Sequence, residues 1–461
     1  MDFSDRKVFF KKLLFLAIPI ILQNGITNFV NLLDNIMVGR VGTAPMSGVA
    51  IVNQLLFVLN ITLFGASAGT GIFTSQFHGR SNADGVRQTV RFKLLATAGL
   101  TAAALVLLLL FGDSLIEAWL HDENAADLAL TRQSARDYLN VMLFGLLPFA
   151  VKESYGSTLR ETGQTAVPMW AAFAAVAVNL VGNYVLIFGK FGAPALGVAG
   201  AAIATVLSRF VECAIVVIHT HRHCDRNTYA VGLYRGFRIE RQLVIDVIRK
   251  TMPLIFNEAI WAVAISMLSR CYSERGLGAV AAVNIAGAVT NVTSVVFLAI
   301  GTTAGIVMGN LLGAGKLEDA KKAALPISLF GAGLALCIGL LEAASSGFFP
   351  LIYNTTDEIR HSASTLILIH GCAQPLLAVS ACEYFILRSG GSVLITLLTD
   401  GMYEWMTSVP VAAILAFLTD VPLTAIYGGV LLAQSLKFVP ASLVMGRGKW
   451  IRNLAGKYDK T

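Results

Sequence analysis

Apolar residues dominate long stretches of the chain, and polar residues gather between these stretches. Each of about twelve stretches is long enough to cross a hydrocarbon core of about 30 Å as an α-helix. The short alternating segments that are typical of membrane β-strands are not found in the sequence. The predicted spans are residues 9–38, 46–77, 90–112, 134–158, 167–189, 196–220, 244–271, 279–312, 323–346, 362–387, 394–418 and 423–445. The pattern therefore predicts an all-α membrane protein with twelve transmembrane helices.

The same pattern occurs twice, once in each half of the chain. Residues 19–24, PIILQN, return as residues 253–258, PLIFNE, and residues 159–163, LRETG, return as residues 387–391, LRSGG. With six helices in each copy, both copies begin on the same side of the membrane, so the repeats are parallel. We therefore expect two six-helix lobes related by a pseudo-twofold axis along the membrane normal. Such a duplication is a common plan for a secondary transporter.

Proline and glycine recur at equivalent positions of the two copies. Pro19 and Pro253 fall within predicted spans, where a proline frees a backbone carbonyl and kinks the helix. Gly65 with Gly69 in the first copy, and Gly301 with Gly305 in the second, form small-residue pairs, which favour close packing of two helices in lipid. The other interpretation is that these positions are flexible points at which a lobe bends during transport.

Composition and charge agree with a membrane protein and set its orientation. Apolar residues make up 56% of the chain and charged residues 14%, and the net charge is +7. Most of the 35 Lys and Arg lie at the termini and in the even-numbered loops, which the positive-inside rule places in the cytoplasm. This basic face is expected to meet anionic lipid headgroups and not a nucleic acid. We predict a multi-pass protein of the bacterial inner (cell) membrane with both termini in the cytoplasm.

The domain boundary is predicted at the longest cytoplasmic loop, which is rich in arginine. Residues 1–220 form the predicted amino-terminal lobe, residues 221–243 the connecting loop, and residues 244–461 the carboxyl-terminal lobe with a short tail. Within the loop region, residues 219–224 read HTHRHC, but neighbouring arginines would repel a metal ion, and a solvated basic loop is the simpler interpretation. The six cysteines are scattered without metal or redox spacing. No Walker-type phosphate loop occurs, so we expect no resident cofactor, no metal centre and no enzyme activity.

Glu258 is the strongest candidate for function among the ionisable residues. A charged side chain within a span costs about 3 kcal/mol on insertion scales and normally faces a cavity or a partner. Glu258 lies about 12 Å beyond Lys250 along the seventh predicted helix, with no basic residue within one turn. A carboxyl group removed from water can exchange a proton near neutral pH, and as an anion it can hold Na⁺ or a cationic compound. Asn257 precedes it, and Trp261 shares its face and offers a cation–π surface.

Other interpretations of these acids stay open at this point. Glu258 could instead reach the interface or bond to a neighbouring helix. Asp34 lies near the outer end of the first predicted helix, where it is either part of a polar stripe or a residue of the headgroup region. Asp400 and Glu404 are four residues apart and share a helix face, and Glu383 on the preceding helix could extend an acidic lining that takes part in ion coupling or substrate binding. Against this, Arg388 is a possible partner of Asp400.

Three further polar sets within the spans favour structural roles. Lys152 with Glu153, and Arg209 with Glu212, are each expected to neutralise one another. His370 is expected to make a polar contact between helices, and it is a weak candidate for a proton relay.

The chain resembles the multidrug and toxic compound extrusion (MATE) transporters. The resemblance is carried by Pro19 and Asp34 in the first span, by residues 253–261 in the seventh, and by Arg160, Gly163, Arg388 and Gly391 after the fourth and tenth. It covers nearly the whole chain, from about residue 9 to residue 445. It implies two six-helix lobes in a V shape. It also implies export of cationic or amphipathic compounds, driven by inward flow of H⁺ or Na⁺.

The resemblance also assigns roles to single residues. Pro19 looks like the bending proline of the amino-terminal lobe, and Asp34 looks like its cation-site aspartate. Asn179 resembles the asparagine beside that site. Asn183 stands where members with a proton site in this lobe have an aspartate, which weakens the case for a two-acid site there. The main coupling site is therefore expected at Glu258, which resembles the acid of the carboxyl-terminal lobe.

Taken together, the sequence predicts a cation-coupled antiporter that works by alternating access. Glu258 would exchange H⁺ or Na⁺ against a cationic or amphipathic small molecule, and Asp34 would assist; Na⁺ could bind at either acid. We expect a monomer in contact with membrane lipid. The rival interpretations are a lipid-linked oligosaccharide flippase, which would need a cationic cavity, and a membrane enzyme, which would need clustered His, Asp or Arg. A non-transporting scaffold would have little reason to keep a deep carboxyl group.

Overall fold

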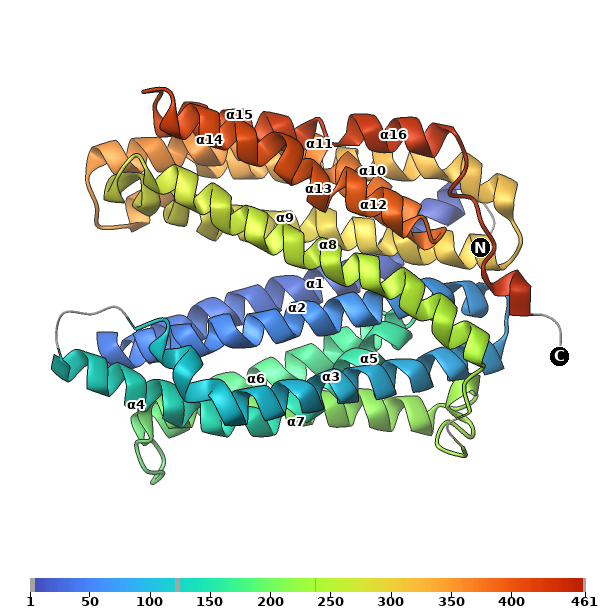
Figure 1. Cartoon of the computed structure of the whole chain (residues 1–461), viewed down its shortest axis with the longest axis horizontal. Coiled ribbons are helices and arrows are strands. Elements are labelled where there is room, and N and C mark those ends of the chain that lie inside the picture. The colour runs from blue at the N-terminus through green and yellow to red at the C-terminus, as the bar shows by residue number, and fades with distance from the viewer. Residues whose placement is uncertain (1–4, 121–124, 237, 459–461) are drawn as a thin grey trace. The chain divides into compact units, whose positions relative to one another are not determined.

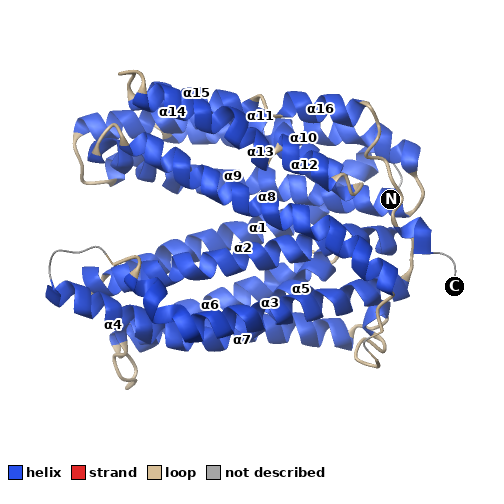
Figure 2. Cartoon of the chain, viewed as in Figure 1, coloured by secondary structure: helices blue, strands red, loops and turns tan. Residues whose placement is uncertain are grey.

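The computed structural model describes residues 5–120, 125–236 and 238–458. Within these residues the chain forms helices joined by turns and loops, and no strand occurs (Figure 2). The helices of the first half are α1 (Arg6–Gly39), α2 (Thr43–Gly79), α3 (Ala83–Glu117), α4 (Ala125–Met142), η1 (Leu143–Gly145), α5 (Leu146–Glu161), α6 (Ala166–Phe188), α7 (Gly197–Arg222) and η2 (Thr228–Ala230). Those of the second half are α8 (Arg241–Ser273), α9 (Leu277–Gly313), α10 (Leu317–Ser345), η3 (Phe349–Ile352), α11 (Asp357–Ser389), α12 (Val393–Thr399), α13 (Gly401–Tyr403), η4 (Glu404–Ser408), α14 (Val409–Phe417), α15 (Leu423–Ser435), α16 (Phe438–Gly446) and η5 (Ala455–Tyr458).

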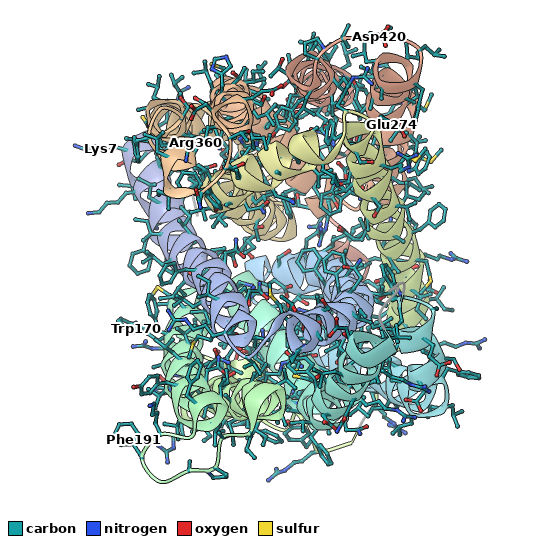
Figure 3. All side chains as sticks on the ribbon, turned by 90° about the vertical axis from the view of Figure 1, so that its left-hand side faces the viewer. Lys7, Trp170, Phe191, Glu274, Arg360 and Asp420 are labelled. Carbon is teal, nitrogen blue, oxygen red and sulfur yellow. The ribbon has the colours of Figure 1, made fainter. Side chains whose placement is uncertain are left out.

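Ten helical segments of the described chain are long and apolar enough to cross a membrane. They are α1, α2, α3, α6, α7, α8, α9, α10, α11 and the segment Leu423–Gly446, which contains α15 and α16. Large apolar side chains lie on the outside of these helices: Leu110 is 71% exposed and Trp170 is 65% exposed. Trp170 and Phe191 both lie at the periphery in Figure 3. Apolar side chains on the outer surface are expected where helices face lipid.

The two remaining predicted spans are less regular than the sequence pattern suggests. The predicted span 134–158 is covered by α4, η1 and α5, which follow one another without a loop. The predicted span 394–418 is divided into α12, α13, η4 and α14. Asp400, between α12 and α13, has φ −120° and ψ −87°, and η4 is a π-helix. The expectation of one straight helix there is corrected to a helix that is interrupted at Asp400. Such interruptions are tolerated at membrane depth where protein surrounds them.

The turn after the second helix of each copy has the same backbone. Ser81 and Gly315 have positive φ angles of 60° and 75°. The N–H of each donates to the carbonyl three residues earlier, at 2.9 and 3.1 Å, and the next N–H donates to the carbonyl five residues earlier. This is the Schellman pattern that ends many helices. An L-residue is disfavoured in this left-handed region, so Ser81 carries a strain that Gly315 avoids.

The density of internal contacts divides the chain into two compact units. The amino-terminal unit comprises Leu22–Thr74 and Ala83–Ile248. The carboxyl-terminal unit comprises Met1–Ile21, of which the structure describes residue 5 onward, together with Ser75–Asn82 and Arg249–Thr461. The helices α1 and α2 therefore contribute residues to both units.

The amino-terminal unit is built around α7. This helix packs along α6 and also contacts α4 and α5, and α3 packs on α5. The apolar core of the unit includes Val52, Leu63, Ala150 and Ala202, which are all fully buried. Buried Arg91 on α3 anchors the loop after α7, since its guanidinium donates to the carbonyls of 232, 233 and 238 at 2.8, 2.8 and 3.0 Å. The loop that follows the first six spans is thereby held against its own unit.

The carboxyl-terminal unit is built around α11. Helices α9 and α10 lie along α11, and α15 and α16 also pack on it (Figure 1). Gly301 and Gly305 of α9 face Phe385 of α11, and a Cβ on Gly301 would come within 2.8 Å of its ring. The prediction of close packing at this glycine pair is therefore confirmed. The tight α9–α11 contact brings the polar side chains of α11 close to those of its neighbours.

Candidate functional site

Glu258 lies on α8 and faces α11. Its Oε1 accepts a hydrogen bond from the Tyr384 hydroxyl at 3.4 Å. Arg388, one turn further along α11, is buried, and its guanidinium lies 5.9 Å from the Tyr384 ring centre and acts electrostatically on Glu258. In the part of the chain that the structure describes, no ion pair joins Glu258 to a basic side chain. Glu258 is thus a partly buried carboxyl group with one long hydrogen bond and the Arg388 guanidinium nearby.

Asp400 and Glu404 share one cation, which is Lys437. The Lys437 Nζ lies 2.8 Å from Asp400 Oδ1 and 2.8 Å from Glu404 Oε1. The sequence offered Arg388 as the partner of Asp400, and this interpretation is wrong, because Lys437 fills that place. Gln434 also donates to Glu404 at 3.3 Å. The two acids therefore belong to a bonded network with α15 and α16 and are not an open acidic surface.

Asn257 supports the interruption at Asp400. Its Nδ2 donates to Asp400 Oδ2 at 2.8 Å, and its Oδ1 accepts from the Gly401 N–H at 2.9 Å. The side chain is 1% exposed. An N–H at the start of a helix lacks a partner within that helix, and Asn257 supplies one from α8. Because Asn257 and Glu258 are neighbours on α8, the candidate acid is tied to the position of the interrupted helix.

Glu383 takes a different partner from the other acids of the carboxyl-terminal unit. Its Oε1 accepts from the Ser442 hydroxyl of α16, and its Oε2 has no hydrogen-bond partner. Its side chain is fully buried. Glu383 is therefore outside the network of Asp400 and Glu404, although the sequence suggested that the three could form one lining.

Asp34 is surrounded by amides in the amino-terminal unit. Asn183 of α6 donates to Asp34 Oδ1 at 2.6 Å. With its amide nitrogen facing Asp34, Asn179 donates to the same oxygen at 2.8 Å while its own oxygen accepts from the Thr205 hydroxyl at 3.2 Å. Asn179 and Asn183 are 4% and 1% exposed. The three residues that the sequence grouped through a family resemblance therefore lie together, with two buried amides around one carboxyl group.

The remaining predicted residues are single positions on the first helix of each copy. Both α1 and α8 continue through their prolines, Pro19 and Pro253. Each proline removes one N–H from the helix, so a carbonyl one turn earlier loses its partner. Trp261 is partly buried on α8, one turn after Glu258.

The basic and acidic residues of α5 and α7 form a wider set than two local pairs. Lys152 lies between Glu153 and Glu212, at 3.7 and 3.6 Å, and Arg160 bonds to Glu153 at 3.0 Å. Arg209 instead donates to the carbonyl of residue 145 at 3.4 Å and stacks on the ring of residue 149. The predicted pair of Arg209 with Glu212 is therefore wrong. The reason is that α5 and α7 pack together, which brings Lys152 to Glu212.

Two buried groups were missed by the sequence interpretation. Lys93 of α3 bonds to Glu161 of α5 at 2.5 Å and to Ser157 at 3.0 Å, and its side chain is fully buried. Glu342 of α10 bonds to three side chains and is also fully buried. The available signal was the presence of Lys93 and Glu342 within the predicted spans 90–112 and 323–346. Neither residue had a partner at helical spacing that would have called attention to it.

The fold and these polar sites define a class of protein. A membrane protein made of two copies of a multi-helix unit, with carboxyl groups inside its spans, has the organisation of a transporter. A model of the MatE family matches residues 19–185 and 253–423, which is more than half of the chain. The protein belongs to the MatE family. It is a multi-pass membrane transporter and not an enzyme.

Known relatives match the chain along almost its whole length. The probable multidrug resistance protein NorM of Thermotoga maritima is 26% identical over 454 residues, which cover 95% of this chain and 93% of that protein. A solved structure described as the outward-facing conformation of a multidrug resistance MATE family transporter superimposes with a TM-score of 0.85, 19% identity and coverage of 95% and 96%. A crystal structure of MATE in complex with MaL6 superimposes with a TM-score of 0.84 and 18% identity, and the match covers 95% of this chain and 97% of that chain. These matches confirm the all-α class with its layout of twelve spans in two six-helix copies.

Proposed function

We propose that the protein is a secondary antiporter that exports cationic or amphipathic small molecules in exchange for inward H⁺ or Na⁺. Relatives named as multidrug resistance proteins support the direction and the substrate class. The exchange would take place across the bacterial inner membrane, with both termini in the cytoplasm and the protein acting as a monomer. No further cofactor is needed, because an ion gradient supplies the free energy.

The observation that carries this proposal is the state of Glu258. Among the described residues its carboxyl group bonds only to Tyr384, whereas Asp400 and Glu404 are held by Lys437. A group whose charge is not already neutralised can change partner when a cation arrives. Binding of that cation shifts the protein between inward-facing and outward-facing states only if the two states bind it with different affinity. We assign Glu258 the main coupling role and Asp34, with Asn179 and Asn183, a supporting role in the other lobe.

Asn257 and Trp261 complete the proposed site on α8. Asn257 connects the site to the interrupted helix, so a change at Glu258 can be transmitted to Asp400. Trp261 would offer its ring to a cationic substrate. Pro19 and Pro253 would allow α1 and α8 to bend as residues 1–220 rock against residues 244–445. Asp400, Glu404 and Glu383 would then act by shaping the carboxyl-terminal lobe.

The test is dye export by cells that express the wild type or Glu258→Gln. We expect cells that express the variant to export a panel of cationic dyes at least tenfold more slowly than wild-type cells, at equal protein abundance. Glu274→Gln is the matched control, since Glu274 lies in the turn directly after α8 and pairs with exposed Arg270. Equal export by wild type and Glu258→Gln would refute the site, and no export by the wild type would refute the direction. Vesicles with separately imposed pH and sodium gradients would then identify the coupling ion.

A further inference from the structure

One buried carboxyl group of the carboxyl-terminal unit, that of Glu342, has no role in the function proposed above. Glu342 lies near the end of α10, and its side chain is 0% exposed. Its Oε1 bonds to His370 Nδ1 of α11 at 2.7 Å. Its Oε2 bonds to Gln374 of α11 at 2.7 Å and to Thr293 of α9 at 2.8 Å. Three helices therefore meet at this carboxyl group, and each of its bonds is made by a side chain.

Each of these three partners can either donate or accept a hydrogen bond. An imidazole nitrogen donates when protonated and accepts when not, and a primary amide presents a donor or an acceptor after rotation. The Thr293 hydroxyl has other acceptors in reach, since it also lies 3.1 and 3.3 Å from two carbonyls of α9. Gln374 Oε1 is buried without a donor in the described arrangement. A protonated Glu342 could donate to that oxygen after the amide turns.

Two other buried carboxyl groups, those of Glu161 and Glu404, do not have this freedom. Glu161 faces Lys93 at 2.5 Å, and Glu404 faces Lys437 at 2.8 Å. A lysine ammonium can only donate, so it stabilises the carboxylate and opposes its protonation. Removing one partner of such a buried pair is strongly unfavourable. The set around Glu342 can therefore satisfy a carboxylate and a carboxylic acid equally well, whereas the lysine-bound sets satisfy only the carboxylate.

The charges around Glu342 also favour uptake of one proton. His370 is the only titratable side chain that bonds to Glu342 among the described residues. The titratable group that faces the pair from α15 is the hydroxyl of Tyr427, and α9 has no titratable residue. Without an added proton, Glu342 and neutral His370 carry one uncompensated negative charge, which is costly in a buried position. One proton on either residue makes the pair neutral.

We propose that Glu342 and His370 form a proton-binding site, separate from Glu258, that takes up and releases one proton. The proton comes from water and bonds to either His370 Nε2 or a Glu342 oxygen, and no other bond forms or breaks. Thr293 and Gln374 are positioning residues that adjust their hydrogen bonds to the state of the carboxyl group. On the predicted topology α10 ends on the outer side of the membrane, so the site lies nearer to that side. The site does not depend on the proposed export.

Infrared difference spectroscopy on the purified full-length protein tests this site directly. Spectra at pH 8 and pH 5 are subtracted for the wild type, Glu342→Gln and His370→Asn. We expect the wild type to show a carboxyl or imidazole protonation signal that is lost in both variants. Glu318→Gln is the matched control, because Glu318 lies on the same helix as Glu342, is exposed and makes no bond to His370, and we expect this variant to keep that signal.

The outcome separates a proton site from a purely structural contact. A wild-type difference spectrum that is unchanged in Glu342→Gln and in His370→Asn would overturn the proposal. If Glu342→Gln does not fold, Gln374→Met and His370→Asn carry the test. Gln374→Met removes the amide and should displace the pH midpoint of the protonation signal. If Glu342 and His370 made only a structural contact, the infrared difference spectrum would show no such signal. Failure of dye export in the Glu258 experiment has no bearing on this result, since the measurement involves no substrate.

Discussion

Equivalent arginines of the two copies have different partners, although each lies just before the same kind of turn. Arg160 and Arg388 each precede a glycine of positive φ, 83° and 73° respectively. In the first copy Arg160 bonds to Glu153 of its own helix at 3.0 Å. In the second copy the position that corresponds to Glu153 is Ala381, and Arg388 instead acts on Glu258 from another helix. The duplication preserved the backbone, and a single missing acid left one arginine available to a different helix.

The acids of the first helices also differ in depth between the copies. Asp34 corresponds to Leu268, which is buried among apolar side chains, and Glu258 corresponds to Asn24. Asp34 is held by two amides, whereas Glu258 has one hydrogen bond of 3.4 Å. Each copy therefore carries one acid on its first helix, and the acid of the second copy is the more weakly held. This difference favours Glu258 as the group that changes partner.

The largest contrast in stability is expected between Lys437 and its counterpart Arg209. Lys437 bonds to two carboxylates, whereas Arg209 bonds to a carbonyl and an aromatic ring. Lys437→Met leaves both carboxylates without a cation and should cost about 3–5 kcal/mol of unfolding free energy. Arg209→Met should cost less than half of that, because it strands no buried charge. Thermal unfolding in detergent measures both variants, and equal losses would contradict the network.

A smaller contrast is expected between the donors of the two first-helix acids. Asn183→Leu removes the bond of 2.6 Å to Asp34 and should cost about 1–3 kcal/mol, because a partly buried carboxyl group loses a donor. Tyr384→Phe removes the bond of 3.4 Å to Glu258 and should cost under about 1 kcal/mol. The same unfolding assay compares them. A larger loss for Tyr384→Phe would show that Glu258, and not Asp34, is the tightly held acid.

The smallest effect is expected at the turn that the two copies share. Ser81→Gly should stabilise the protein by up to about 1 kcal/mol, because glycine adopts the positive φ of 60° without strain. Gly315→Ser should destabilise it by a similar amount, since φ there is 75°. Dye export is the control, and it should stay unchanged in both variants. If Ser81→Gly destabilised the protein or Gly315→Ser stabilised it, the two turns would have to differ in their surroundings as well as in the residue of positive φ.

The positions of most spans were predictable from the sequence because membrane thickness sets the length of an apolar helix. The duplication was also visible, since Pro19 and Pro253 occupy equivalent places in it. The grouping of Asp34 with Asn183 came from a family resemblance and not from spacing. The interruption at Asp400 was not predicted, because no proline lies there and a tertiary bond from Asn257 supports it.

The chain by itself therefore determined the class, the spans and the acids that lie within them. Only the tertiary structure decided which partner each of those acids has. Lys437 reaches Asp400, Lys93 reaches Glu161, and His370 reaches Glu342 across helices that are far apart in the sequence. Helical spacing reveals neighbours within one or two turns, whereas these bonds depend on which faces pack together. The free energy of a buried charge is set by its bonded partners, and those partners are fixed by packing.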